Sequence, residues 1–266
     1  MNKLTIITIN FNNAEGLKRT IDSIINQTFS DYEWIVVDGS STDGSKDLLE
    51  QYQERFTWWC SEPDKGPYNA MNKGIAHASG EYINFMNSGD VFVDKDILQK
   101  IFHLPHTADI IYGQMKVTAW GGKIGNVDVM KPRLSKYDMF FDTFGHQSTF
   151  TKRTLFTQVG LFDESYKIAA DHKFFAEAIA IHQASYKYLP YVISVYEGDG
   201  LSGSYDKIYP EVIRMRQEVY CSDWIHDTDH LYSNMRTIAN YDWAMKLFNL
   251  LVRIASKLQR TFNRTR

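Results

Sequence analysis

Acidic, amide and hydroxyl side chains follow two apolar runs of the sequence, and they are the groups best suited to bind a ligand. One run ends in Asp38, which is followed by Gly39 and the hydroxyl residues 40–42. This pattern suits a nucleobase or a ribose better than a phosphate, because a phosphate cradle is normally glycine-rich and led by backbone N–H groups. Neither a G-x-G-x-x-G nor a G-x-x-x-x-G-K-[ST] run occurs. The alternative is structural: Asp43 caps a helix and Asp38 only ends a strand.

Two strand–loop–helix units are predicted to position these groups. Residues 4–9 and 34–37 are β-branched apolar runs, which predict buried parallel strands. The first leads into Asn10 and Asn12 before a helix, and the second leads into Asp38 before a helix near Ser45. Ligands of open α/β sheets lie just beyond the carboxyl ends of the strands, so we expect both loops to line one pocket.

Further motifs continue in unbroken order to about residue 95. The first matching residues are Thr8, Asn10 and Asn12. The later motifs are residues 37–44, 62–66, 70–75, 78–83 and 87–90. In these motifs the chain resembles the nucleotide-binding half of glycosyltransferase family 2, and the likeness is thinner from there to about residue 200. The resemblance implies an α/β, GT-A fold: a Rossmann-like nucleotide-binding mixed sheet flanked by helices. It also implies that Asp38 reads the base in a nucleotide site formed by Thr8, Asn10, Asn12, Asp38, Ser40, Asp64 and Asn72.

A metal or diphosphate site is implied at residues 87–90. Family members commonly carry D-x-D here, but this chain has Asn87 and Gly89 at the two acidic positions, and only the following Asp90 is acidic. The resemblance therefore implies that Asp90, helped by the weaker amide ligand Asn87, holds Mg²⁺ or Mn²⁺ against the donor diphosphate. The alternative is a plain tight turn, because Asn-Ser-Gly-Asp is also a good turn sequence.

The resemblance also implies a catalytic base. Inverting members use an Asp, often in an E-D pair, at the start of a helix that follows a G-x-F-D/E stretch. Here that stretch is 160–163, and the matching acid is Asp171, which Ala170 precedes. Its apolar neighbours predict that desolvation raises the pKa of Asp171, as suits a base. The alternative is that Asp171 caps a helix beginning at His172.

Three further candidates have equally simple structural explanations. His146 precedes a predicted strand on the acceptor side and is a candidate acceptor-binding residue, although a lone histidine is more often structural. Lys65 and Lys73 lie near the expected nucleotide site, or they are solvated. The glycine-rich residues 198–204 match a mobile segment that covers the diphosphate in similar enzymes, or they form a linker.

Composition narrows the class of protein. The 266 residues carry a formal net charge of −3, which argues against a nucleic-acid partner. The two cysteines are typical of a reducing compartment. Residues 1–3 lead directly into the first predicted strand, so we expect no signal peptide, and no apolar run approaches the roughly 20 residues of a membrane span. These features predict a cytoplasmic protein, soluble or peripheral on the inner face of the membrane.

The domain organisation predicted is a catalytic domain over 1–205, with a nucleotide-sugar half (1–95) and an acceptor half (96–205), followed by a helical extension over 206–266. Within the extension, residues 244–266 contain six Lys or Arg and no acid, beside an apolar stripe at helical spacing. Such a helix favours an anionic membrane surface. The alternative is a terminal helix packed on the domain or on a sister subunit, which would make the protein a homo-oligomer.

Together, the residues and the resemblance predict an inverting hexosyl- or N-acetylhexosaminyl-transferase. Its donor would be a nucleotide-diphosphate sugar, UDP-linked, and its acceptor a saccharide or polyprenyl-linked saccharide of surface polysaccharide synthesis. The processive signature Q-x-x-R-W is absent, which favours single additions. Two other classes stay open: a nucleotidyltransferase, whose glycine- and Lys/Arg-rich activating loop is missing, and a non-catalytic nucleotide-sugar-binding module, which the depleted D-x-D suggests.

Overall fold

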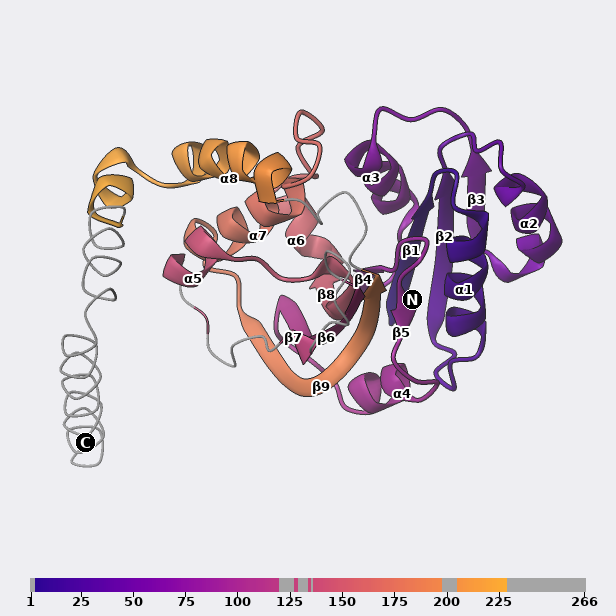
Figure 1. Cartoon of the computed structure of the whole chain (residues 1–266). Helices are drawn as coiled ribbons and strands as arrows, with labels where there is room; N and C mark the ends of the chain where they lie inside the picture. Colours follow the sequence, from indigo (N-terminus) through magenta and orange to yellow (C-terminus); the bar gives the residue numbers. More distant parts are fainter. Residues whose placement is uncertain (1–2, 120–126, 129–133, 135, 198–204, 229–266) are drawn as a thin grey trace. The chain divides into compact units, whose positions relative to one another are not determined.

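The computed structural model describes residues 3–119, 127–128, 134, 136–197 and 205–228 (Figure 1). The chain separates into two compact units, Met1–Met215 and Arg216–Arg266. The predicted boundary at 205/206 coincides with the start of helix α8 (Tyr205–Val219), and most of that helix belongs to the first unit. The loop 198–204 and the tail 244–266 lie outside the described residues. Among the described helices, none is long and apolar enough to cross a membrane.

The described strands form one mixed sheet in the order β3-β2-β1-β4-β8-β6-β9-β5, with β7 paired to β6. They are β1 (Leu4–Asn10), β2 (Tyr32–Asp38), β3 (Trp58–Ser61), β4 (Tyr82–Phe85), β5 (Val91–Phe92), β6 (Ile110–Ala119), β7 (Val127–Asp128), β8 (Thr149–Lys152) and β9 (Tyr186–Glu197). The four strands β3, β2, β1 and β4 are mutually parallel. Strand β8 is antiparallel to both β4 and β6, whereas β9 runs parallel to β6.

Helices and strands alternate from β1 to β4. They are α1 (Ala14–Ile25), α2 (Ser45–Tyr52), η1 (Gln53–Arg55), α3 (Pro67–His77), α4 (Ile97–Phe102), α5 (Lys136–Phe141), η2 (His146–Ser148), α6 (Arg153–Gln158), α7 (Ala170–Ala180) and α8. The mixed α/β class is confirmed. The sequence pattern also predicts helices over 152–159 and 171–182, where the structure has α6 and α7. Polar–apolar alternation around Gly121 and Gly122 predicts a hairpin over residues 115–124. Its turn lies outside the described residues, and β6 pairs antiparallel with β7.

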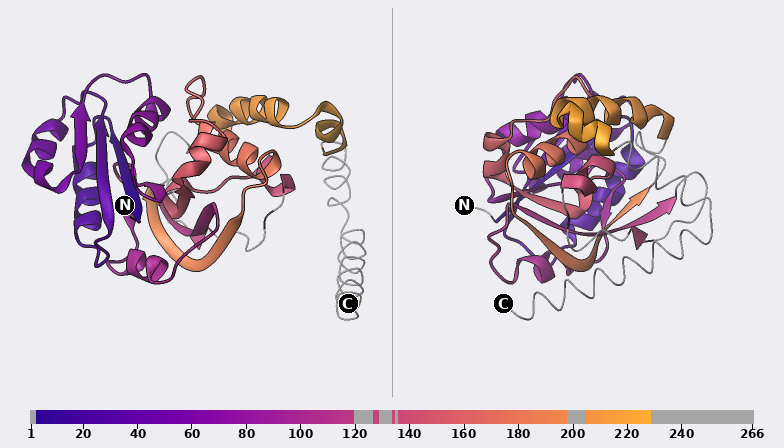
Figure 2. Two further views of the ribbon diagram at one scale, coloured as in Figure 1. Left: turned by 180° about the vertical axis from the view of Figure 1, so that it is seen from behind. Right: turned by 90° about the vertical axis from the view of Figure 1, so that its left-hand side faces the viewer.

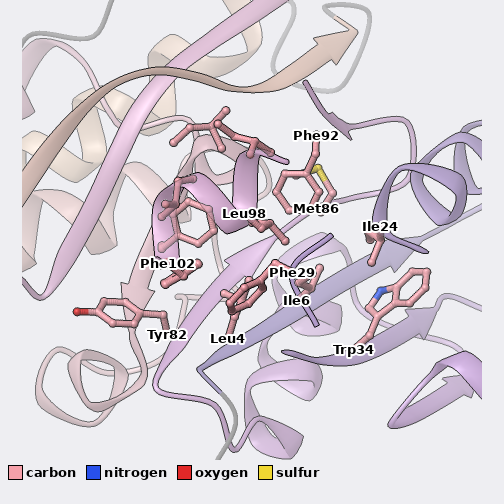
Figure 3. Packing of buried hydrophobic residues seen from close by; sticks show 14 of the residues in the cluster. Leu4, Ile6, Ile24, Phe29, Trp34, Tyr82, Met86, Phe92, Leu98 and Phe102 are labelled. Atoms are coloured by element: carbon pink, nitrogen blue, oxygen red, sulfur yellow. The ribbon is translucent and has the colours of Figure 1, made fainter. Parts of the chain in front are cut away.

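The two faces of the parallel strands are covered by different helices. Leu4 and Ile6 of β1 share a buried cluster with Ile24 of α1 (Figure 3). Ile7, on the opposite face, packs on Gly74 of α3 so closely that a Cβ there would lie 2.5 Å from the Ile7 methyl. A strand buried on both faces explains why these runs are apolar without alternation.

The second half of the sheet is strongly curved. Strand β9, orange in Figure 1, bends in both that view and the reverse view of Figure 2. Its register with β6 shifts between Tyr112 and Gln114, again at Met115, and between Val117 and Ala119. Bulges of this kind bend a strand and increase its twist. The bend lets one sheet continue from the parallel strands β3, β2, β1 and β4 to the later strands β8, β6 and β9.

Strand β1 lies between β2 and β4, which follow it along the chain on opposite sides. This is a topological switch point, where ligands of open α/β sheets bind beyond the carboxyl ends of the strands. In register, Asn10 at the end of β1 pairs with Asp38 at the end of β2. The predicted pocket-lining loops therefore leave the sheet side by side.

Candidate active site

Asp38 is the organising residue of the first two loops. Its side chain is fully buried, and its carboxylate accepts hydrogen bonds from Ser41 Oγ (2.6 Å), Asn10 Nδ2 (2.7 Å), Ser61 Oγ (2.7 Å) and Ser41 N (2.9 Å). Burial raises the pKa of Asp38, but these hydrogen bonds outweigh it and hold the pKa below its usual range. A carboxylate offers about four acceptor positions. Because protein donors fill them here, Asp38 fixes the loop and offers no ready position to a base.

The two loops are joined through Ser41, a residue that the sequence did not single out. Asn12 N donates to Ser41 Oγ (2.8 Å), and Thr42 N donates to Asn12 Oδ1 (2.9 Å). Asn12 and Ser40 are both exposed and have positive φ angles of 48° and 66°. Non-glycine residues in this conformation are strained and cluster at functional sites. The predicted residues Asn12 and Ser40 thus lie at the exposed rim.

An exposed aromatic ring stands beside this rim. Phe11 is 65% exposed, and a Cβ on Gly39 would lie 3.0 Å from its ring and 2.7 Å from Asp64 Oδ2. Gly39 therefore separates a ring face from the carboxylate of the predicted residue Asp64. The sequence analysis did not select Phe11, although a large apolar residue between Asn10 and Asn12 is unusual in a polar loop.

Two predicted nucleotide residues are turned to internal contacts. Thr8 is fully buried, and its Oγ1 accepts from Trp34 Nε1 (3.1 Å). The buried amide of Asn72 pairs with the backbone of Phe162 (2.8 and 3.0 Å) and also donates to Glu164 (3.0 Å). Both side chains are held by internal hydrogen bonds, so the structure does not bring them to the rim.

Residues 87–90 form a tight turn, as the alternative interpretation predicts. Asp90 N donates to Asn87 O (2.9 Å), and Gly89 has a φ of 103°, which type II turns require at the third residue. Thr20 of α1 fixes the turn, because its hydroxyl accepts from Gly89 N (3.0 Å) and donates to Asp90 O (2.8 Å). Glycine at position 89, the second acidic position of a D-x-D, adopts this conformation without the cost that a side chain would add.

His146 connects this turn to Asp171. Its Nδ1 lies 3.3 Å from Asp171 Oδ2, and its Nε2 lies 3.0 Å from Asn87 Nδ2 and 4.0 Å from Asp90 Oδ2. All three ionisable side chains are largely buried, with 21% of His146, 14% of Asp171 and 8% of Asp90 exposed. The structure thus brings together the predicted metal, base and acceptor residues, which come from three separate segments.

The surroundings of Asp171 correct two expectations. Helix α7 begins at Ala170 with Ala169 as its N-cap, so Asp171 lies in the first turn and is not the cap. Burial raises its pKa, but the hydrogen bond and charge of His146 and the hydroxyl of Tyr68 outweigh it, so the pKa is lowered, not raised. Tyr68 OH donates to Asp171 Oδ1 (2.9 Å). The carboxylate is therefore held ionised.

Glu211 of α8 holds the segment that leads into Asp171. Its carboxylate accepts from the backbone N–H groups of Lys167 (2.8 Å), Ile168 (2.9 Å) and Ala169 (2.9 Å), directly before α7. Three successive N–H groups form a concavity suited to an anion. Neither Glu211 nor Tyr68 stood out in the sequence, because both act through contacts made far along the chain.

The turn offers oxygen ligands suited to a divalent cation. Asn87 Oδ1 is buried with no hydrogen-bond partner among the described residues, and Asp90 adds a carboxylate. Within that part of the chain, no group of three or more His, Cys, Asp or Glu side chains is placed to hold a metal. Mg²⁺ commonly binds through one or two carboxylates plus substrate phosphates, so this small set fits a cation that arrives with a diphosphate.

Comparison with known proteins identifies the family. The sequence model of "Glycosyl transferase family 2" matches residues 5–160. An uncharacterized glycosyltransferase of Mycobacterium tuberculosis is 34% identical over 187 residues, which cover 67% of this chain and 69% of that protein. The chain belongs to glycosyl transferase family 2. A further family relative, the PGL/p-HBAD biosynthesis glycosyltransferase of Mycobacterium bovis, is 29% identical over 75% of this chain and 79% of its own length.

Solved structures show that this glycosyltransferase has the GT-A fold. The 1–349 fragment of S. aureus TarS in complex with UDP-GlcNAc superposes with a TM-score of 0.63 and 20% identity, over 80% of this chain and 65% of the fragment. The match spans only 38% of a longer TarS chain. The mannosyltransferase PcManGT of Pyrobaculum calidifontis, in complex with GDP-Man and Mn²⁺, gives a TM-score of 0.60 and 19% identity, over 98% and 83% of the two chains.

Proposed function

We propose that this glycosyltransferase works with inversion, moving a hexosyl or N-acetylhexosaminyl group from a UDP-sugar to a saccharide or polyprenyl-linked saccharide. The observation that carries the proposal is the meeting of Asp90, His146 and Asp171 beside the carboxyl ends of β1, β2 and β4. The chemistry needs charge stabilisation at the departing diphosphate and a base at the acceptor hydroxyl. The cluster supplies a group for each.

The nucleotide is proposed to bind over the first two loops. Asn12, Ser40 and Asp64 would contact the nucleoside from the rim, and the exposed face of Phe11 would stack on its base, an interaction open to any nucleobase. Asn10 would contribute its amide oxygen, which is buried with no hydrogen-bond partner among the described residues. Asp38 would act indirectly, by fixing Ser41.

A UDP-linked donor is preferred because TarS has been solved with UDP and with UDP-GlcNAc. The GDP-Man complex of PcManGT makes a GDP-linked donor the main competitor. Both proteins share the fold at low identity, so the donor must be measured. A role in surface polysaccharide or glycolipid synthesis is supported by the PGL/p-HBAD relative.

Asp90 and Asn87 are the proposed holders of Mg²⁺ or Mn²⁺. When bound, the cation would neutralise charge that develops on the departing diphosphate. The protein contributes a turn that Thr20 holds rigid, so both side chains are preorganised.

Asp171 is the proposed base. Its Oδ1 already accepts from Tyr68 OH and His172 N, whereas Oδ2 faces His146 Nδ1 and would accept the acceptor hydroxyl on its other lone pair. A low pKa keeps this oxygen unprotonated at neutral pH. The hydroxyl becomes acidic as it bonds to the anomeric carbon, and its proton then passes to Oδ2.

A panel of UDP-, GDP- and dTDP-sugars, titrated by calorimetry with Mn²⁺ present, tests the donor. We expect UDP-sugars to bind, Asp90→Asn to weaken that binding, and the exposed control Asp206→Asn to leave it unchanged. Release of free UDP on adding lipid-linked saccharide would separate a transferase from a binding module. Binding of a UDP-sugar with no turnover on any lipid-linked or soluble saccharide would favour the binding module.

A further inference from the structure

His146 lies directly before β8, as the sequence predicts, and its side chain contacts other proposed site residues. Its ring lies between the proposed base and the proposed metal residues, with one nitrogen directed to each. We propose that His146 Nε2 is itself a ligand of the divalent cation, beside Asp90 and Asn87. This inference rests on the proposed function, because the cation is expected to enter with the donor diphosphate.

The contact with Asp171 decides which ring nitrogen can bind a metal. An ionised carboxylate only accepts hydrogen bonds, so the nitrogen facing it, Nδ1, carries hydrogen. In the neutral ring, Nε2 then carries the lone pair, which accepts from Asn87 Nδ2 (3.0 Å) and which a cation would take over once that amide turns. A histidine whose second nitrogen donates to a carboxylate is the usual arrangement of metal-binding histidines, because that partner fixes the ring and its tautomer.

The spacing of the groups around Nε2 suits one ion. Ligands at about 2.1 Å from an octahedral cation lie roughly 3.0 Å apart when adjacent and roughly 4.2 Å apart when opposite. The observed 4.0 Å between His146 Nε2 and Asp90 Oδ2 is close to the larger of these spacings. Asn87 Nδ2 lies 3.0 Å from Nε2, so a half-turn of the amide would bring Oδ1 to the same side. Asn87 Oδ1, buried and unpartnered within the described part of the chain, is the atom that gains most from a cation.

The segments that carry these ligands are fixed by neighbouring elements, one by helix α1 and the other by strand β4. Thr20 ties the turn at residues 87–90, and the amide of Asn84 in β4 donates to the carbonyls of His146 (3.4 Å), Gln147 (3.3 Å) and Thr149 (2.9 Å). The imidazole would thus replace a carboxylate that the depleted D-x-D lacks. An imidazole in the ligand set shifts preference from Mg²⁺ toward first-row transition metals.

Pulsed EPR of Mn²⁺ bound together with UDP tests this ligation without any activity readout. The wild-type protein is expected to show nitrogen coupling to Mn²⁺, which changes when histidine alone is labelled with ¹⁵N. His146→Ala should remove the coupling and raise the Kd for Mn²⁺ by at least about tenfold, since loss of even an outer-shell partner costs 10- to 100-fold. The exposed control His182→Ala should retain both properties.

The outcomes separate this inference from the proposed function. Binding of Mn²⁺ and UDP without histidine coupling in the wild type would overturn ligation by His146 and leave the proposed function intact. Coupling that persists in His146→Ala would assign it to another histidine and overturn the inference equally. Failure of the wild-type protein to bind Mn²⁺ and nucleotide at all would overturn both. If the His146→Ala variant folds poorly, the wild-type spectrum alone still shows whether a histidine binds Mn²⁺.

Discussion

Nδ1 of His146 lies 3.3 Å from Oδ2 of Asp171, although 25 residues separate them in the sequence. The contact joins the segment before β8 to the first turn of α7. Through Nε2 it continues to Asn87 and the turn that holds Asp90. The proposed base and the proposed metal site are therefore parts of one network.

The pKa of His146 should report this network directly. Burial lowers that pKa, but the hydrogen bond and charge of Asp171 and the charge of Asp90 outweigh it, so the pKa is raised. An NMR titration of ¹⁵N-labelled histidine in EDTA should place it above the usual value of about 6.5. In Asp171→Asn it should fall, because the hydrogen-bonded anion is gone. An unchanged value would show that the two side chains do not interact in solution.

The same pair predicts a pH dependence of stability. The raised pKa of His146 contributes stability that is present below about pH 6.5 and is lost as pH rises through the folded-state pKa. The lowered pKa of Asp171 contributes stability that is present above about pH 3.9 and is lost at lower pH. The Tm difference between wild type and Asp171→Asn should be largest between about pH 4 and 6.5 and shrink toward pH 8. A difference independent of pH would contradict this.

Gly89→Ala should destabilise the protein by about 1–2 kcal/mol, measured by urea denaturation. The cause is backbone conformation, because φ is 103° and a Cβ there would only touch Asn13 Nδ2 at an ordinary 3.5 Å. Gly160→Ala, with a φ of 111° and open space around it, is the matched control. Both variants should lose stability, but only Gly89→Ala should weaken binding of Mn²⁺ and UDP. Equal affinities of the two variants for Mn²⁺ and UDP would show that the turn is not part of the ligand site.

Asp38→Ala should lower the free energy of unfolding by about 3 kcal/mol or more, because it strands several buried donors. The sequence alone predicts only the loss of a base contact, with the domain intact. Ser61→Ala, which removes one of the four hydrogen bonds, should cost about 1 kcal/mol. Urea denaturation beside a UDP titration distinguishes the two roles. A stable Asp38→Ala with weakened UDP binding would restore the direct-contact interpretation.

Residues 244–266 are expected to bind anionic membranes. Their six cations and no acid should contribute about 1 kcal/mol each near an anionic surface. Full-length protein should co-sediment with anionic vesicles, less so at high salt, and a variant lacking 244–266 should stay in the supernatant. The packing alternative predicts no vesicle binding by either form, and a truncated protein that is less stable or changes its oligomeric state.

The sequence predicts the scaffold well because burial on both faces leaves a local signature. The apolar runs ending at Asn10 and Asp38 become neighbouring parallel strands, and the residues after them meet at one edge. The tight turn at Asn87–Asp90 was also predictable, because glycine readily adopts the positive φ that such a turn requires. These features depend on residues close together in the chain.

The hydrogen-bond partners of individual side chains could not be predicted, because those partners are distant in the sequence. Thr8 and Asn72 have types suited to a nucleotide, yet Trp34 and the backbone of Phe162 occupy them. The pKa of Asp171 moves opposite to the expectation for the same reason. Its apolar neighbours in sequence indicated desolvation, whereas the donors that outweigh it come from the separate segments that carry Tyr68 and His146.

The most direct test of the central claim is the rate of UDP release from UDP-GlcNAc by wild type and Asp171→Asn, with water or added lipid-linked saccharide as acceptor and donor affinity measured in parallel. Asp171→Asn keeps shape but removes the base, so the rate should fall by about 10² or more at saturating donor and Mn²⁺, with donor binding preserved. Glu177→Gln, on the same helix but paired with Lys173, should retain the wild-type rate. Near-normal turnover in Asp171→Asn would contradict the account and direct attention to Asp163 or Glu164.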